Sequence, residues 1–204
     1  MIIVDYNVGN IGSIVNMFKK IGVKARLSSD KSEILAADKL LLPGVGSFDH
    51  GMKSLYQSGL IDVLNRKVLE DKTPILGICL GMQLLLSGSD EGSEPGLGWI
   101  KGRVKRFDFS KLPEKLKIPH MGWNVVYPKN NQCLFKYFDE EARFYFVHSY
   151  YVECEDSRDS LATTLYGDIF TSAVGRENVY GAQFHPEKSH RFGMQLLKNF
   201  VELT

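Results

Sequence analysis

The sequence predicts an α/β fold with a mixed, mainly parallel doubly wound sheet, flanking helices and a smaller antiparallel section. Short apolar runs alternate with amphipathic helical patterns over residues 2–86, as in sheets built from strand–helix–strand units. Residues 100–183 instead carry short β-like runs with few helical periods. The sequence contains no linker, repeat or low-complexity tract, which predicts a single domain over residues 1–204.

The first half predicts four parallel strands with helices between them. Asn10 can cap a helix that begins at Ile11, and Gly22 ends that helix. A short helix opens at Ser28–Asp30, and two helical stretches lie between Ser47 and Glu70. The expected strands are Ile2–Val4, Val23–Leu27, Lys39–Leu42 and the run Pro74–Ile78.

The second half predicts mostly strands, several of them antiparallel. A polar, Gly-rich loop spans Ser87–Gly98, and the last helix spans Arg191–Leu203 with Phe192, Leu196 and Phe200 on one face. The expected strands are Val104–Phe109, Asn124–Tyr127, Phe144–Val147, Tyr150–Glu153, Ala162–Leu165, Ile169–Val174 and Val179–Phe184.

The composition excludes several classes of protein. A net charge of +1 gives no global field for nucleic acid or a membrane surface. The three cysteines are odd in number and widely spaced, without a Cys-x-x-Cys pair, so we expect no disulfide framework, zinc site or other metal. The N-terminus is too short and lacks the basic start of a signal peptide, and no apolar run reaches membrane-spanning length. We therefore expect a reduced, cytoplasmic protein.

Cys79 lies in the most informative stretch, Pro74–Gln83. An apolar strand stops at this cysteine, between Gly77 and Gly81, and a helix restarts directly after it. Gly-x-Cys-x-Gly in that context is the cysteine form of a nucleophile elbow. A thiol at a helix N-terminus favours the thiolate, and the N–H of Leu80 can stabilise an oxyanion. The alternative is a buried structural cysteine beside two packing glycines.

His185 is the favoured base. It ends a predicted strand, and Glu187 follows two residues later across Pro186, which stiffens the link. Cys, His and Glu would then act as nucleophile, base and orienting group. His50, His120, His148 and His190 remain rival bases, because triads assemble in space rather than in sequence.

Pro43–Gly46 follows the third strand, at the sheet edge where such folds place ligands. Its glycines let backbone N–H groups point at a bound group, although a plain tight turn would have the same composition. The segment lacks the Lys-Ser/Thr ending of a phosphate loop and the Gly-x-Gly-x-x-Gly pattern, so it predicts no nucleotide site.

Three segments together resemble the class I (triad) glutamine amidotransferases, over essentially the whole chain. They are Gly77–Gln83, Pro43–Gly46 and Phe184–Lys188. Further segments are similar to one branch of that family, the glutaminase subunits of the histidine pathway; they are Asp5–Tyr6, Gly9–Asn10, Pro119–Asn124 and His148–Tyr150.

The resemblance implies roles for individual residues and no cofactor. Cys79 would attack the side-chain amide of L-glutamine, with His185 as general base and acid and Glu187 orienting it. Oxyanion donors would be the backbone N–H groups of Leu80, Val45 and Gly46. Glutamine would be held by Gly44, Gln83, Glu91, His148, Ser149 and Tyr150. Taken alone, Gln83 and Glu91 would be solvated polar groups, and His120 would be a satisfied core or loop histidine.

The resemblance also implies a partner, because released ammonia must be kept from water. That partner is a separate cyclase subunit with a β/α barrel, forming a heterodimer. The expected contact residues are Asn7, Asn10, His120, Trp123 and Lys188. Three alternatives remain: an amidotransferase for another synthase such as a surface-sugar-modifying enzyme, a cysteine hydrolase of related architecture, and a non-catalytic subunit.

Overall fold

The secondary structure of the computed structural model is described over residues 1–9, 11–110, 116–129, 132–138 and 141–204. The helices are α1 Ile11–Lys20, α2 Lys31–Leu35, α3 Phe48–Ser58, α4 Ile61–Asn65, α5 Leu80–Leu84 and α6 His190–Leu203. The strands are β1 Ile2–Val4, β2 Arg26–Ser28, β3 Leu40–Leu42, β4 Ile75–Ile78, β5 Gly88–Ser89, β6 Gly102–Arg106, β7 His120–Val125, β8 Tyr127–Pro128, β9 Arg143–His148, β10 Tyr150–Cys154, β11 Ser160–Tyr166, β12 Asp168–Arg176 and β13 Val179–Ala182. A π-helical turn at Arg66–Glu70 extends α4, and 3-10 turns lie at Cys133–Phe135, Ser157–Asp159 and Pro186–Lys188.

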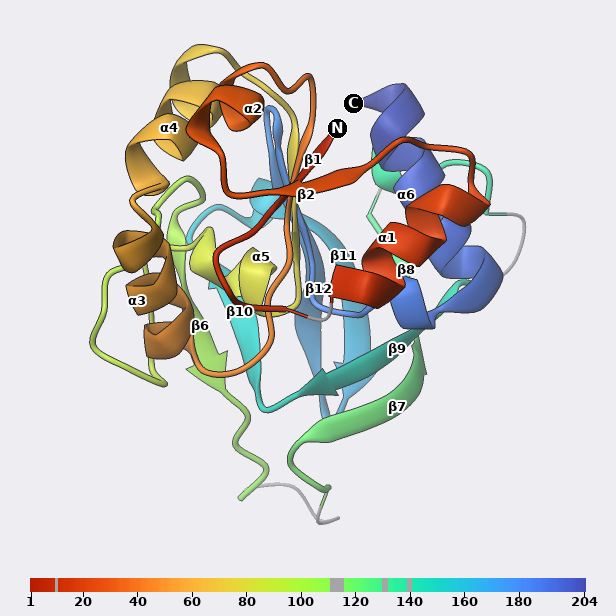
Figure 1. Ribbon diagram of the computed structural model, residues 1–204. Helices are drawn as coiled ribbons and strands as arrows, with labels where there is room; N and C mark the ends of the chain where they lie inside the picture. The colour runs from red at the N-terminus through yellow and green to blue at the C-terminus, as the bar shows by residue number, and fades with distance from the viewer. Residues whose placement is uncertain (10, 111–115, 130–131, 139–140) are drawn as a thin grey trace.

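One mixed sheet runs through the molecule in the order β2-β1-β3-β4-β13-β12-β10-β6-β5 (Figure 1). The strands from β2 to β13 are parallel to one another. From β13 onward the pairs β13–β12, β12–β10 and β10–β6 are antiparallel, and β11 pairs with β12 in a hairpin. A separate antiparallel ribbon consists of β7 and β9. The predicted fold class is therefore confirmed.

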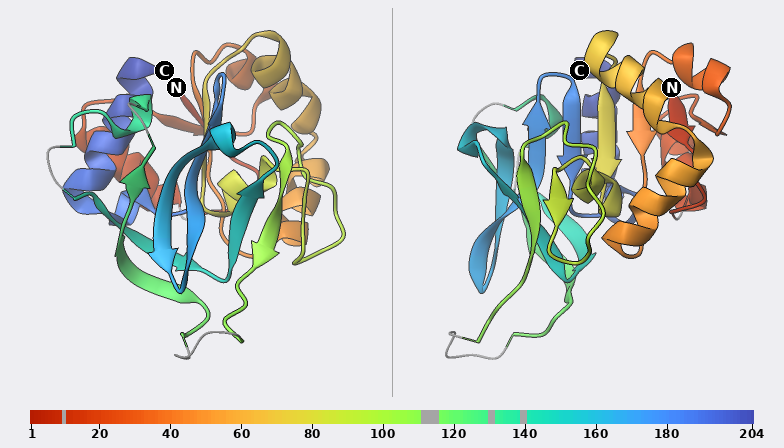
Figure 2. Two further views of the ribbon diagram at one scale, coloured as in Figure 1. Left: turned by 180° about the vertical axis from the view of Figure 1, so that it is seen from behind. Right: turned by 90° about the vertical axis from the view of Figure 1, so that its left-hand side faces the viewer.

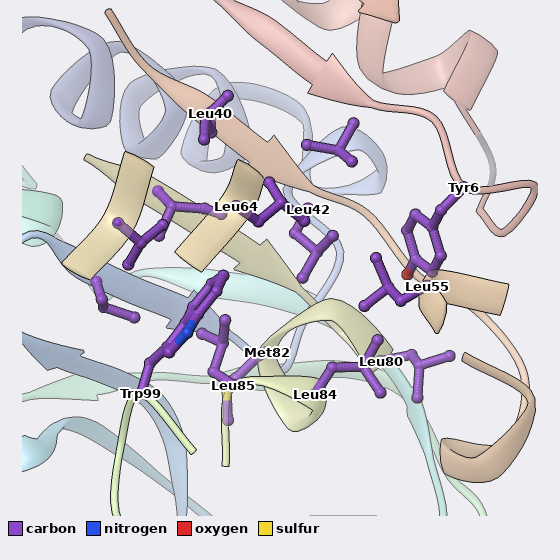
Figure 3. Packing of buried hydrophobic residues seen from close by; sticks show 14 of the residues in the cluster. Tyr6, Leu40, Leu42, Leu55, Leu64, Leu80, Met82, Leu84, Leu85 and Trp99 are labelled. Atoms are coloured by element: carbon purple, nitrogen blue, oxygen red, sulfur yellow. The ribbon is translucent and has the colours of Figure 1, made fainter. Parts of the chain in front are cut away.

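Two apolar layers cover the two faces of the parallel part of the sheet. Helices α1 and α6 lie on one face, and α2, α3 and α4 lie on the other, as the views from the front and the side show (Figures 1 and 2). Figure 3 shows the layer under α3 and α4, where Leu42, Leu64 and Trp99 pack around the side chains of α5. These fully apolar layers hold the carboxyl ends of β3, β4 and β13 in fixed positions.

The second predicted strand begins later than expected. The N–H of Val23 donates to the carbonyl of Phe18 at 2.9 Å and so closes the end of α1. Because residues after Gly22 complete that helix end, pairing with β1 starts only at Arg26. The other expected strands lie within a few residues of their predicted bounds. Asn10, the expected helix cap, lies outside the described residues.

No helix in the described part of the chain is both long and apolar enough to cross a membrane.

Candidate active site

The turn between β4 and α5 forces Cys79 into a conformation that L-residues rarely adopt, with φ +53° and ψ −109°. The turn is tight because other segments press against it. A Cβ on Gly81 would lie 1.9 Å from the carbonyl oxygen of Leu42, and a Cβ on Gly77 would lie 2.6 Å from the carbonyl oxygen of Gly81. Glycine is required at both positions, and the thiol is held at the carboxyl edge of the sheet.

His185 reaches the same edge because β13 lies parallel to β4, with Ala182 opposite Ile78. Its Nδ1 lies 2.7 Å from Oε1 of Glu187, and the two side chains are 3% and 2% exposed. Pro186 begins the 3-10 turn that brings the carboxylate back onto the ring. The Glu187 carboxylate accepts from Nδ1–H, which leaves Nε2 as the nitrogen that can exchange a proton.

Two opposing effects set the pKa of His185. Burial lowers the pKa, but interaction with the side chain of Cys79 and the hydrogen bond to Glu187 outweigh burial and raise it to about 9. Nε2 is buried and has no partner in normal hydrogen-bonding geometry among the described residues. The ring is therefore favoured as an imidazolium with one N–H uncommitted.

A cavity of about 370 Å³ opens over Cys79 and His185. It brings together most of the residues that the sequence singled out: Cys79, Leu80, Val45, Gly46, Gln83, Glu91, His148, Ser149, Tyr150, His185 and Lys188. Pro119 and Val147 complete the wall. Glu187 lies behind His185, and Gly44 is buried behind the cavity wall.

The loop after β3 lies directly against the elbow. A Cβ on Gly44 would be 2.7 Å from the backbone nitrogen of Gly81 and 2.9 Å from Cβ of Leu80. Tyr6 fixes the loop from below by donating its hydroxyl to the carbonyl of Pro43. Burial, together with the nearby Cys79, raises the pKa of Tyr6 well above its usual range, so the phenol stays a donor. Gly46 has φ +105°, and Val45 is 43% exposed at the mouth of the cavity.

Two polar side chains of the wall have partners in the protein. Oε2 of Glu91 accepts from the backbone N–H of Phe48 at 2.8 Å. Gln83 donates to the carbonyl of Tyr150 at 3.3 Å and to Oε1 of Gln183 at 3.1 Å. Gln183 was not among the residues that the motifs singled out, although the register of β13 against β4, carried one residue further, places it beside Cys79.

No cluster of three or more His, Cys, Asp or Glu side chains suited to a metal ion occurs in the described ranges.

The match to known proteins covers the whole chain. Residues 2–203 match the family model "Glutamine amidotransferase class-I". The chain belongs to this family. It is 56% identical over 200 residues, 98% of either chain, to a protein of Methanococcus maripaludis named imidazole glycerol phosphate synthase subunit HisH 2. It is 52% identical over 204 residues, 100% of either chain, to a protein of the same name from Pseudomonas aeruginosa.

The fold of this amidotransferase is also that of solved structures. One, titled crystal structure of glutamine amidotransferase, matches with a TM-score of 0.74 at 20% identity, over 99% of this chain and 97% of that one. At this identity the likeness concerns the fold alone.

The rival histidines of this amidotransferase lie in other environments. His50 and His190 are exposed, and His190 stacks on Trp123 with ring centres 5.4 Å apart. His120 and His148 are buried and bonded to each other, Nδ1 to Nε2, at 3.0 Å. Within the described residues, His185 is the histidine that is paired with a carboxylate.

The expected contact residues divide by exposure. Asn7 and Lys188 are exposed, and Trp123 is 48% exposed on the outer side of β7. Lys188 lies over the ring of Tyr145 at 5.4 Å. His120 is only 3% exposed, which corrects its expected place at a surface. Asn10 lies outside the described residues.

The alternation of side chains along a strand could have shown that His120 and Trp123 face opposite sides of β7. Side chains at odd separation on a strand face opposite ways. If Trp123 faces outward, His120, three residues away, faces the interior.

Proposed function

We propose that this chain is the glutaminase subunit of an imidazole glycerol phosphate synthase, which hydrolyses L-glutamine and delivers ammonia to a cyclase subunit. The observation that carries the proposal is the Cys79–His185–Glu187 arrangement, with Cys79 and His185 lining a cavity. The full-length relatives from Methanococcus maripaludis and Pseudomonas aeruginosa carry the name of that subunit.

Cys79 is the nucleophile of the proposed reaction. Its thiolate attacks the side-chain carbonyl carbon of glutamine, and the imidazolium of His185 gives its Nε2 proton to the departing ammonia. A glutamyl thioester remains on Cys79. His185, now neutral, takes a proton from water, which attacks the thioester and releases glutamate. Glu187 keeps Nδ1 protonated throughout, at 2.7 Å.

The tetrahedral oxyanion needs donors that are in place before the reaction. The N–H of Leu80 stands at the first position of α5, directly after the nucleophile. The loop that carries Val45 and Gly46 borders the same cavity. We assign the oxyanion donors to Leu80 and to this loop, with Gly44 supporting the loop from behind.

The amino-acid end of glutamine is assigned to the far wall of the cavity. Glu91 presents a carboxylate for the α-ammonium group while its second oxygen bonds Phe48. Gln83, Ser149 and Tyr150 supply neutral polar atoms, and His148 borders the side-chain end. Since burial keeps His148 neutral by lowering its pKa to about 3, it brings no charge next to the scissile amide.

A partner is required because protonated ammonia is no longer a nucleophile. Val45 and Lys188 line the cavity and are exposed. The exposed apolar side chains Met121 and Trp123 lie on β7, where Met121 is opposite the cavity residue Val147. We place the cyclase subunit, a β/α barrel, on this face, with Asn7, Trp123 and Lys188 in the contact. Residues 1–204 would act in the heterodimer as one domain, because one sheet crosses both halves of the chain.

Glutamate release tests the proposal. The chain is assayed with L-glutamine alone, and then with a histidine-pathway cyclase subunit and its nucleotide ligand. We expect slow release alone and strong stimulation by the loaded partner. Cys79→Ala should abolish the glutamine-dependent activity of the complex and leave its activity with ammonium salts. No release from folded, reduced protein under any condition would overturn the proposal.

A second candidate is an amidotransferase that serves a different synthase. The same cavity residues would serve it, because the roles assigned to them concern glutamine and not the acceptor of the ammonia. Release of glutamate that is indifferent to the histidine-pathway cyclase but stimulated by another synthase would select this candidate.

A further inference from the structure

Gln183 is a buried amide that touches the sulfur of the nucleophile. It follows β13 directly, and its side chain is 0% exposed. Its Nε2 lies 3.8 Å from Sγ of Cys79, which is within hydrogen-bonding range for a sulfur acceptor. Its backbone N–H is used elsewhere, on the carbonyl of Ser172 at 2.9 Å.

Two neighbours determine which end of this amide faces the sulfur. The carbonyl of Tyr150 can only accept, so the atom of Gln83 that meets it must be the amide nitrogen. The same nitrogen meets Gln183, so the facing atom of Gln183 must be its oxygen. The N–H group of Gln183 is therefore turned toward Cys79 and cannot be exchanged for its oxygen without breaking both contacts.

The Tyr150 carbonyl, which determines the orientation of Gln83, is itself bonded to one of a pair of histidines. Nδ1 of His148 donates to the Tyr150 carbonyl at 2.7 Å. Its Nε2 therefore accepts from Nδ1 of His120, and Nε2 of His120 accepts from Nδ2 of Asn124 at 3.3 Å. The hydrogen bonds therefore run from Asn124 through the two histidines, the Tyr150 carbonyl and the two glutamines to the sulfur of Cys79. Only one choice of tautomer and amide orientation gives each of these groups a matching partner.

We propose that Gln183 is a further active-site residue, whose side-chain N–H stabilises the thiolate of Cys79 and whose orientation is set by Gln83. The inference rests on the proposed function only in taking Cys79 as the nucleophile. A hydrogen bond to a charged acceptor in a buried site favours the charged form. The amide supplies this stabilisation without adding a charge, so it leaves the proton exchange between Cys79 and His185 intact.

A purely structural role would give different behaviour. Burying an amide costs free energy unless its polar atoms are bonded. Here Oε1 is bonded to Gln83, and the contact described for Nε2 is the sulfur. If the amide only filled space, replacing it with an apolar side chain of similar length would leave the reactivity of Cys79 unchanged.

Alkylation of Cys79 tests the inference without glutamine or a partner. The full chain carries Cys133→Ser and Cys154→Ser, so that Cys79 is its only thiol. The rate of reaction with iodoacetamide is followed by mass spectrometry from pH 6 to pH 10. The other titratable groups facing Cys79, namely His185 with Glu187, Tyr6, and His148 and Glu91 on the cavity wall, are the same in every variant.

Gln183→Met removes the donor and keeps the length of the side chain. We expect alkylation at pH 7 to slow about 5- to 10-fold, with the midpoint of the rate curve at higher pH, since a donor to the thiolate is lost. Gln183→Glu keeps the shape and turns an oxygen toward the sulfur, so the slowing should be at least as large. The control Gln195→Leu, which removes an amide bonded to Asn199 on α6, should react within about twofold of the parent.

Folded Gln183→Met or Gln183→Glu protein that reacts within about twofold of the parent would overturn the inference. If the methionine variant does not fold, the nearly isosteric glutamate variant decides alone. In glutamate release, both variants should lose kcat and keep KM. If the variants show the expected alkylation rates but the chain never releases glutamate, the role of Gln183 is retained and the proposed function is rejected.

Discussion

Two histidine sites of this protein, both buried, have opposite protonation preferences. At the edge of the parallel strands, the neighbours of His185 raise its pKa to about 9 in spite of burial. In the β7–β9 ribbon, burial lowers the pKa of His120 to about 4 and that of His148 to about 3. His120 and His148 lie opposite each other in the register of that ribbon.

The difference in pKa between the two sites comes from the groups that contact each histidine and not from how deeply it is buried. His185 interacts with a carboxylate and with the sulfur of Cys79, both of which can carry negative charge. The described hydrogen-bonding partners of His120 and His148 are an amide, a carbonyl and each other, none of which can balance a proton. A buried histidine becomes an acid–base group only where an anion meets it, and otherwise serves as a directional neutral connector.

The largest effect on activity should follow from removing His185, the histidine that is favoured in its charged form. His185→Ala should lower kcat/KM for glutamate release by about a thousandfold or more, since no group remains to donate a proton to ammonia. Activity of the complex with ammonium salts should persist. The exposed His50 offers the control, and His50→Ala should stay within about threefold of the parent. Retention of a tenth of the activity by His185→Ala would show that another base serves Cys79.

The two neutral histidines, His120 and His148, should instead make the free energy of unfolding depend on pH in mildly acidic solution. Because their folded pKa values lie below the unfolded value, the unfolded chain binds more protons below about pH 6.5. The free energy of unfolding should therefore fall by about 2–4 kcal/mol between pH 7 and pH 5. Urea denaturation at a series of pH values measures this change.

His120→Phe provides the matched variant for that series. It keeps an aromatic ring between Phe146 and Tyr166, with which His120 stacks. The variant should lose stability at pH 7, but its dependence on pH should be about half as steep, because one of two groups no longer titrates. A slope equal to that of the parent would mean that His120 is not neutral in the folded protein. His185 opposes a small part of this change. Its raised pKa keeps it protonated in the folded protein, while the unfolded chain still gains that proton between pH 7 and pH 5, so it adds less than about 1 kcal/mol of stability over this range.

The smallest effect should come from giving His120 a carboxylate partner like the one that His185 has. Asn124→Asp places a carboxylate against Nε2 of His120, as Glu187 stands against His185. The carboxylate should raise the pKa of His120 above about 5, which NMR titration of the ring can follow. Asn124→Leu removes the amide without adding charge and should leave the pKa low. Equal pKa values in the two variants would mean that a carboxylate partner is not what separates the sites.

The sequence alone predicted the elements with local signals. The turn at Cys79 and the His185-Pro186-Glu187 segment each place their chemistry within a few residues, so a strand end and a tight turn suffice to predict them. The triad order and the parallel half of the sheet followed from the same kind of signal. The corresponding contacts within each segment are made in the structure.

Contacts between segments could not be predicted in this way. Gln183 meets Cys79 across a strand pair, and Gln83 meets Gln183 from a helix, so both contacts depend on packing between elements. The series from Asn124 to His148 likewise requires the register of β7 against β9. The motif that contains His120 gives the residue type but not the face of the strand, so it cannot show that the side chain is buried.

The backbone of Cys79 has a consequence for how the sequence can change. With φ at +53°, this residue holds a conformation that costs any side chain about 1–3 kcal/mol and costs glycine almost nothing. Selection for heat resistance alone is therefore expected to replace the nucleophile with glycine. The cysteine would then be retained only under selection for activity, at a backbone position where catalysis and thermal stability favour different residues.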